Sequence, residues 1–193
     1  MVFETPLTGG ASTVSSSYVR SELRELYNWG GANGNCDGDG DANWGPTGRH
    51  VLRGTLAVTD YYADDPQTVV GQIHAKDSSK ALLKLQWDGP NKDLRAIVNE
   101  DPVNGNPFNM DFGLIPGTNE FSYEIVLEDG TMTVSVTYDN ETVSESVTFG
   151  SGVMSSEWND HVYYFKAGNY AQASKDSGGN FRVEFTDLEV VHN

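Results

Sequence analysis

Residues 121–150 read FSYEIVLEDGTMTVSVTYDNETVSESVTFG, and this stretch decides the fold class. Apolar and polar residues alternate along it, which is the period of a β-strand with one buried face. Two turn signals, Asp129-Gly130 and Asp139-Asn140, interrupt the alternation. Turns this short join neighbouring antiparallel strands. The stretch therefore predicts an antiparallel meander.

The same alternation recurs on both sides of the meander. We predict further strands at residues 15–26, 50–60, 68–76, 80–88, 93–100, 161–172 and 180–191, and one helical turn at 154–158. No internal repeat, low-complexity tract or linker divides the 193 residues, and this length suits one domain. So many short strands predict a single all-β domain over residues 1–193, built as a two-sheet antiparallel sandwich or jelly roll.

The chain is strongly acidic, since 28 Asp and Glu residues oppose 12 Lys and Arg residues for a formal net charge of −16. Nucleic acids and anionic membranes are recognised through basic surfaces, so the charge argues against both as partners. No apolar run approaches the length of a membrane-spanning helix. Cys36 is the single cysteine and cannot form an intrachain disulfide. The composition is that of a globular domain that binds neither nucleic acid nor an anionic membrane.

Three of the predicted strands carry an unusual polar face. Side chains two positions apart point to the same side of a strand. Solvent faces are usually rich in Ser, Thr, Lys and Glu, whereas these faces carry arginine, glutamine, histidine and tyrosine. The residues that share this parity are Tyr18, Arg20, Glu22 and Arg24 in the first strand, Gln72 and His74 in the second, and Tyr164, Lys166, Tyr170 and Gln172 in the third. This is the composition of a binding groove.

The segments that form these faces are RSELR at 20–24, QIH at 72–74 and YFKAGNYAQ at 164–172. In this order they resemble the three signature segments of the alginate lyases of polysaccharide lyase family 7, and together they span most of the chain. Ala171 departs from the pattern, because the family commonly has Asn there. The resemblance implies a β-jelly roll whose concave sheet binds alginate, a chain of uronates. It also implies a monomer that needs no organic cofactor.

The resemblance also assigns roles to individual residues. By position, Arg20, Gln72, His74 and Tyr170 match the catalytic residues of the family. The positions that match residues holding the sugar in the groove are Glu22, Arg24, Lys166 and Gln172.

These residue types suit β-elimination next to a uronate. The reaction removes the C5 proton, builds negative charge on the carboxylate and expels the 4-linked sugar, so it needs donors at the carboxylate, a base and an acid. Arg20 offers a planar fork that fits a carboxylate, and Gln72 adds an uncharged donor. His74 is the natural base near neutral pH. Tyr170 can donate a proton to the leaving oxygen and, with a depressed pKa, could also act as a base.

Each of these residues also has a structural interpretation. Arg20 and Arg24 flank Glu22 and could form an ion-pair ladder on a solvent face. His74 alone is typical of a hydrogen-bonded structural histidine, and Tyr170 of a sheet aromatic with its hydroxyl at the rim. Lys166 alone would be a solvated lysine. Their occurrence together, on one parity and in one set of motifs, favours catalysis.

Two other functions compete with a lyase. A non-catalytic uronate-binding β-sandwich module would also use an arginine-lined groove, but it has no need of a histidine and a tyrosine beside that arginine. A glycoside hydrolase usually requires two carboxyl groups across its cleft. Glu22 is the one carboxylate in the three motifs, so the required pair is missing.

A few features lie outside the three motifs. The carboxylates of Asp37, Asp39 and Asp41 alternate in a glycine-rich loop and are weak candidates for a structural Ca²⁺ site. This loop has no glutamate at the end that would complete a twelve-residue calcium loop. Four tryptophans could stack on sugars, although packing in the core is the default for each. They are Trp29, Trp44, Trp87 and Trp158.

The resemblance leads to two further expectations. Ile73 stands where the family has Ile or Val, and Ile tends to accompany a preference for guluronate blocks. The family also implies a secreted or periplasmic protein. Residues 1–10, MVFETPLTGG, have neither the basic nor the apolar region of a signal peptide, so we expect this chain to be a mature form.

Overall fold

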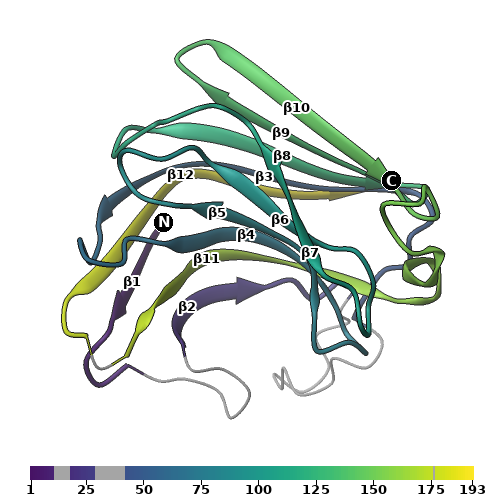
Figure 1. Cartoon of the computed structure of the whole chain (residues 1–193), viewed down its shortest axis with the longest axis horizontal. Helices are drawn as coiled ribbons and strands as arrows, with labels where there is room; N and C mark the ends of the chain where they lie inside the picture. The colour runs from purple at the N-terminus through teal and green to yellow at the C-terminus, as the bar shows by residue number, and fades with distance from the viewer. Residues whose placement is uncertain (11–17, 29–41, 176) are drawn as a thin grey trace.

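The computed structural model describes residues 1–10, 18–28, 42–175 and 177–193 (Figure 1). Within these ranges a single short 3-10 helix, η2, spans Ser156–Asp160, close to the predicted helical turn. No described helix has the length and apolar character needed to span a membrane. The strands are β1 (Val2–Pro6), β2 (Tyr18–Arg24), β3 (Arg49–Asp60), β4 (Thr68–Ala75), β5 (Ala81–Trp87), β6 (Arg95–Asn99), β7 (Pro107–Asp111), β8 (Phe121–Glu128), β9 (Thr131–Tyr138), β10 (Glu141–Thr148), β11 (Tyr163–Ser174) and β12 (Asn180–His192).

The strands form two antiparallel sheets that pack face to face (Figure 1). The outer sheet has the order β1-β12-β3-β8-β9-β10. The second sheet has the order β2-β11-β4-β5-β6-β7, and we call it the groove sheet because it carries the site described below. This architecture confirms the predicted all-β two-sheet sandwich.

The meander that decided the fold class is β8, β9 and β10. Both of its turns have two central residues with positive φ, which is the requirement of a type I′ hairpin. Asp129 and Gly130 have φ values of 48° and 76°, and Asp139 and Asn140 have values of 52° and 65°. The strands pair in continuous register on both sides of these turns. The prediction from residues 121–150 is therefore confirmed in its detail.

Two strands, β1 and β7, were not predicted from the sequence. Each has five residues and lies at the edge of its sheet, and each has a proline at one end, Pro6 or Pro107. Proline lacks the N–H that a central strand must donate, so it is tolerated at sheet edges and strand ends. Strands this short with a proline give too little alternation to be recognised.

The core lies between the two sheets and takes one face from each. Ile73 and Phe165 enter it from the groove sheet, and Leu52 and Ile125 enter it from the outer sheet, all with at most 1% of their surface exposed. Side chains of this size each contribute about 1.5–3 kcal/mol when fully buried. Period two leaves the alternate residues of β4 and β11 on the opposite face, where the site is built.

The described tryptophans belong to this core. Trp44, Trp87 and Trp158 are 0–2% exposed. Each indole N–H has an acceptor within the protein, for example the Gly117 carbonyl oxygen 2.8 Å from Nε1 of Trp87. Packing is therefore confirmed for these three, and they cannot stack on a sugar. Trp29 lies outside the described residues, as do Cys36 and the calcium candidates Asp37, Asp39 and Asp41.

Gly168 allows β11 to approach β2 closely. Its φ is +148°, and a Cβ built on it would lie 2.4 Å from the Ser21 carbonyl oxygen and 2.8 Å from the Glu22 Cα. A larger residue would push the two strands apart. Because Gly168 lets β11 lie close to β2, Lys166 and Tyr170 on either side of it lie near the polar residues of β2.

Candidate active site

Pairing within the groove sheet aligns polar residues from four strands in one row. Lys166 pairs with Arg24 on one side and with Gln72 on the other, and Gln72 pairs in turn with Lys84. Four residue pairs farther along β2 and β11, Arg20 pairs with Tyr170. Paired residues of adjacent strands point to the same face of a sheet. Strands far apart in sequence therefore place these side chains together.

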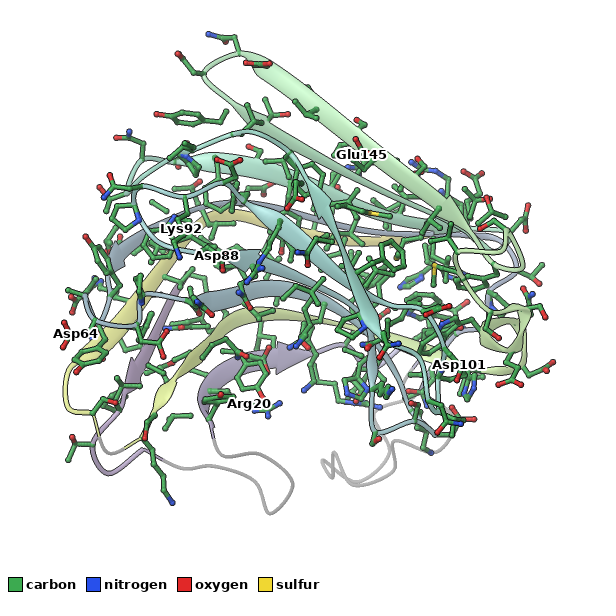
Figure 2. All side chains as sticks on the ribbon, viewed as in Figure 1. Arg20, Asp64, Asp88, Lys92, Asp101 and Glu145 are labelled. Carbon is green, nitrogen blue, oxygen red and sulfur yellow. The ribbon has the colours of Figure 1, made fainter. Side chains whose placement is uncertain are left out.

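A groove of about 610 Å³ lies on this face. All four residues predicted to be catalytic line it, and so does Lys166. Figure 2 shows where Arg20 stands on β2, the edge strand of the groove sheet. The side chains that line the groove are Arg20, Gln72, His74, Ser78, Ser79, Lys80, Ala81, Lys84, Asn99, Tyr164, Lys166 and Tyr170.

The Arg20 guanidinium lies against the aromatic ring of Tyr170. Its Cζ is 3.9 Å from the ring centroid, and its Nη1 is 3.5 Å from Oε2 of Glu22. A guanidinium held between a ring face and a carboxylate keeps few rotamers, so it is already oriented when a ligand arrives. About 23% of the Arg20 side chain remains exposed, which leaves donors free to face the groove.

Glu22 is buried beneath the groove and does not line it. Its side chain is 4% exposed, and its Oε2 lies 3.5 Å from Arg20 and 3.6 Å from Nζ of Lys166. Its Oε1 accepts a hydrogen bond from Nε2 of Gln72. That bond fixes the amide of Gln72, which is 2% exposed and lines the groove. The structure thus places Glu22 where it orients three groove residues.

His74 is held in one tautomer by its backbone neighbour. Its Nδ1 lies 2.7 Å from the Ala75 carbonyl oxygen, which can only accept, so Nδ1 carries the proton and Nε2 has the lone pair. The ring stacks on Tyr164 with centroids 5.4 Å apart. Burial lowers the His74 pKa below its usual value, and the positive charges of Lys166 and Arg20 lower it further. The imidazole is therefore a neutral base near neutral pH.

Lys166 reaches the groove from β11. Burial lowers the pKa of its ammonium, and the neighbouring Glu22 carboxylate opposes that effect. Its side chain is 14% exposed, so it presents its charge in a partly desolvated environment. A carboxylate that enters the groove would interact with this charge more strongly than with one in open water.

Arg24 and Gln172 were predicted to hold the sugar, and both are described, but neither is among the side chains that line the groove. The Arg24 Cζ lies 4.0 Å from the centroid of the Tyr164 ring, and Nη2 donates to Oδ1 of Asn43 at 2.9 Å. Nε2 of Gln172 donates to the Tyr170 carbonyl oxygen at 3.1 Å. The Arg24 guanidinium therefore contacts the groove residue Tyr164, and the Gln172 amide contacts the backbone of the groove residue Tyr170.

The structure adds groove residues that the sequence did not single out, among them Ser78, Ser79, Lys80, Lys84 and Asn99. Lys84 has a recognisable signal, because it shares the parity of Gln86 within KALLKLQW and breaks an otherwise apolar strand. The others have none. Ser78 and Lys80 lie in and beside the β4–β5 turn, where no periodicity predicts the direction of a side chain. Among the described residues no cluster of three metal-ligating side chains occurs.

A sequence model of the alginate lyase family matches residues 1–192. No curated protein matches the chain. Among solved structures, alginate lyase A1-II′, a member of polysaccharide lyase family 7, is 28% identical and superposes with a TM-score of 0.78, over 100% of this chain and 79% of its own. Alginate lyase PA1167 from Pseudomonas aeruginosa is 27% identical, with a TM-score of 0.74 over 100% of this chain and 82% of its own.

A doubly substituted A1-II′, with one His-to-Asn and one Tyr-to-Phe change, was solved in complex with the substrate GGMG. It is 29% identical to this chain, with a TM-score of 0.80 over 100% of this chain and 78% of its own. A Tyr-to-Phe variant of the same lyase was solved with the product GGG. These similarities extend over the whole sandwich and confirm the predicted jelly roll.

Proposed function

Since the chain belongs to the alginate lyase family, we propose that it cleaves alginate by β-elimination in the groove of its groove sheet. One observation carries the proposal: Arg20, Gln72, His74 and Tyr170, from three strands, all line one groove. Together they supply the donors at the carboxylate, the base and the acid that elimination requires.

The proposed reaction starts with the uronate carboxylate beside Arg20 and Gln72. His74 Nε2 takes the proton from C5, and the electron pair left behind forms the C4–C5 double bond while the bond from C4 to the leaving oxygen breaks. The Tyr170 hydroxyl donates its proton to that oxygen. One product carries a 4,5-unsaturated uronate, and the other carries a new hydroxyl. Arg20 and Gln72 stabilise the charge that builds on the carboxylate before the second bond breaks.

The geometry favours a lyase over both competing functions. A binding module has no use for a histidine held as a neutral base beside a tyrosine. A retaining or inverting hydrolase needs two carboxyl groups facing the scissile bond. Within the described part of the chain the groove lining contains no Asp or Glu, and Glu22 beneath it is already engaged by Arg20, Gln72 and Lys166.

We further propose a preference for guluronate-containing segments. The support is Ile73, whose identity accompanies such a preference in the family, and the GGMG and GGG ligands of the A1-II′ complexes. Ile73 lies between Gln72 and His74 in the sequence, and its own side chain is fully buried. Any influence of Ile73 on the sugar therefore acts through the positions of those two neighbouring side chains. Digestion of purified polyguluronate and polymannuronate tests the preference, and equal rates on the two would contradict it.

Four other features of the proposal rest on the family resemblance. We propose that the protein acts as a monomer, that alginate or its oligosaccharides are its partner, and that it is secreted or periplasmic. We also propose that the chemical step needs no organic cofactor or metal, because Arg20 and Gln72 can neutralise the carboxylate unaided.

A single assay separates the candidate reactions. Alginate is incubated with the protein, and near-ultraviolet absorbance and reducing ends are followed together. A lyase raises both, because its product has a double bond conjugated with the carboxylate. A hydrolase raises reducing ends without the absorbance, and a binding module raises neither, so either of those results would refute the proposal.

A further inference from the structure

Lys84 differs from Arg20, Lys166 and Arg95 of the same sheet in having no anionic partner among the described residues. Arg20 and Lys166 share Glu22, and the Arg95 Nε lies 2.6 Å from Oδ2 of Asp88. By contrast, no described carboxylate or hydrogen-bond acceptor raises the pKa of Lys84, which burial and the positive charge of Arg95 both lower. A partly desolvated ammonium with a second cation as its charged neighbour is unfavourable in the unliganded protein.

Lys84 nevertheless points into the groove and lines it. It continues the row that runs from Lys166 through Gln72, one strand farther from β2. Adjacent strands lie about 4.8 Å apart, so the backbone of Lys84 is roughly one strand spacing from Gln72 and two from Lys166. This step is similar to the length of one sugar ring, so a chain lying across the strands would place the unit next to the reacting one beside β5.

We propose that Lys84 binds the carboxylate of a uronate unit adjacent to the one that reacts, on the β5 side of Gln72. The proposal rests on the proposed function for the identity of the polymer. A polyanion supplies the negative charge that Lys84 lacks in the unliganded groove. In this partly desolvated environment the attraction between the Lys84 ammonium and a ligand carboxylate is stronger than at an exposed lysine. It also relieves the repulsion between Lys84 and Arg95, whose own carboxylate, Asp88, is only 7% exposed.

The test compares Lys84→Met with Lys92→Met. Both substitutions remove one positive charge, but Lys92 is exposed in the connection between β5 and β6 and does not line the groove (Figure 2). We expect Lys84→Met to raise KM for alginate by about tenfold or more, as the loss of one charged contact would. We expect its kcat to stay within about threefold of the wild type, because Lys84 does not contact the reacting unit. Lys92→Met should change neither constant by more than about twofold.

Thermal unfolding adds a second readout. Since no carboxylate in the described ranges pairs with Lys84, Lys84→Met should melt at the same temperature as the wild type or higher. Lys84→Arg keeps the charge and should recover most of the lost affinity. A lower melting temperature for Lys84→Met would identify a structural lysine. An unchanged KM, a fall in kcat alone, or equal effects of the Met and Arg variants would also overturn the proposal.

The outcome does not depend on turnover. If the wild-type protein proves inactive on alginate, the proposed function fails. Calorimetric titration with guluronate oligosaccharides would still measure the contribution of Lys84 to binding affinity. Weaker binding by Lys84→Met than by Lys92→Met would support the site, and equal binding would reject it.

Discussion

Positive charge is paired differently on the outer sheet and at the Glu22 end of the groove. On the outer sheet, Arg53 contacts Glu124 at 2.6 Å and Glu189 at 2.7 Å, and Arg182 contacts Glu184 at 2.7 Å and Glu4 at 2.8 Å. On the groove sheet, Arg20 and Lys166 share the single carboxylate of Glu22 at 3.5 and 3.6 Å. The first arrangement cancels charge in water, and the second retains it in a partly buried groove.

This difference would allow a chain with a net charge of −16 to bind the acidic polymer that we propose as its substrate. Carboxylates pair with the arginines of the outer sheet, whereas the groove lining contains Arg20, Lys80, Lys84 and Lys166 and, within the described residues, no carboxylate. Exposed ion pairs such as those of the outer sheet contribute about 0–1 kcal/mol each. The local field in the groove, and not the net charge, sets what the protein binds.

The largest test of the comparison is removal of the two groups that we propose transfer protons in the groove. His74→Ala and Tyr170→Phe should each lower kcat by at least about a hundredfold, the lower range of what general acids and bases supply. Neither substitution should unfold the protein, because both side chains line the groove and lie outside the core. Circular dichroism and steady-state kinetics measure the two effects. A folded variant that keeps more than about a tenth of the wild-type rate would remove its residue from the mechanism.

A second test contrasts one carboxylate from each sheet. Glu22→Gln leaves Arg20 and Lys166 without their shared counter-charge and loosens Gln72, so kcat/KM should fall by about tenfold or more, and the free energy of unfolding by about 1–3 kcal/mol. Glu124→Gln changes the net charge equally on the outer sheet. It should leave kcat/KM unchanged and alter the free energy of unfolding by at most about 1 kcal/mol. Equal effects of the two variants would abolish the distinction between the sheets.

A third test uses pH to measure the charge around His74. The histidine acts as a base only when neutral, and burial together with Lys166 and Arg20 lowers its pKa below the ordinary 6.5. The neutral form therefore persists above pH 6.5, so kcat/KM should not fall on this account until the pH drops below 6.5. Below the lowered pKa it should fall about tenfold per pH unit. Lys166→Ala removes one of the cations and should move this acid limb to higher pH. A wild-type limb that begins above pH 6.5 would contradict the assignment.

Sequence alone predicted which polar residues share a face because period two acts within one strand. Arg20 and Glu22, or Gln72 and His74, share a face whatever the strand pairs with. The row through Lys84 depends on pairing between β4 and β5, whose register shifts twice, between Val69 and Gly71 and between Ile73 and His74. Such irregularities cannot be counted from the sequence of either strand.

Burial was also beyond reach of the sequence. The parity of β2 put Glu22 on the groove face beside Arg20, and the structure agrees. It did not show that Glu22 would be 4% exposed and hydrogen-bonded to Gln72, which lies far along the chain. Leu23 shows the reverse, since its parity predicts the core, yet it is 47% exposed because β2 is an edge strand.

The smallest expected effect concerns how salt acts on the two kinds of charge. An acidic polymer must first approach the negative field that the excess carboxylates create. At 0.1 M salt, charges more than about 10 Å apart are largely screened, whereas close contacts within the groove are screened much less. Apparent affinity or kcat/KM should therefore rise a few-fold from very low salt to an ionic strength on the order of several hundred millimolar, and then fall as the contacts themselves weaken.

Lys166→Ala distinguishes the two contributions, because it removes a contact inside the groove and leaves the distant field almost unchanged. It should weaken binding at every salt concentration and preserve the rise at low salt. Its matched control, Lys92→Met, alters only exposed charge and should leave the whole profile in place. Measurement of kcat/KM across a salt series shows whether the long-range negative field or the positive groove controls the approach of the polymer. A kcat/KM that falls steadily from the lowest salt onward would show that the positive groove already dominates the approach, and that the carboxylates of the outer sheet have no effect at a distance.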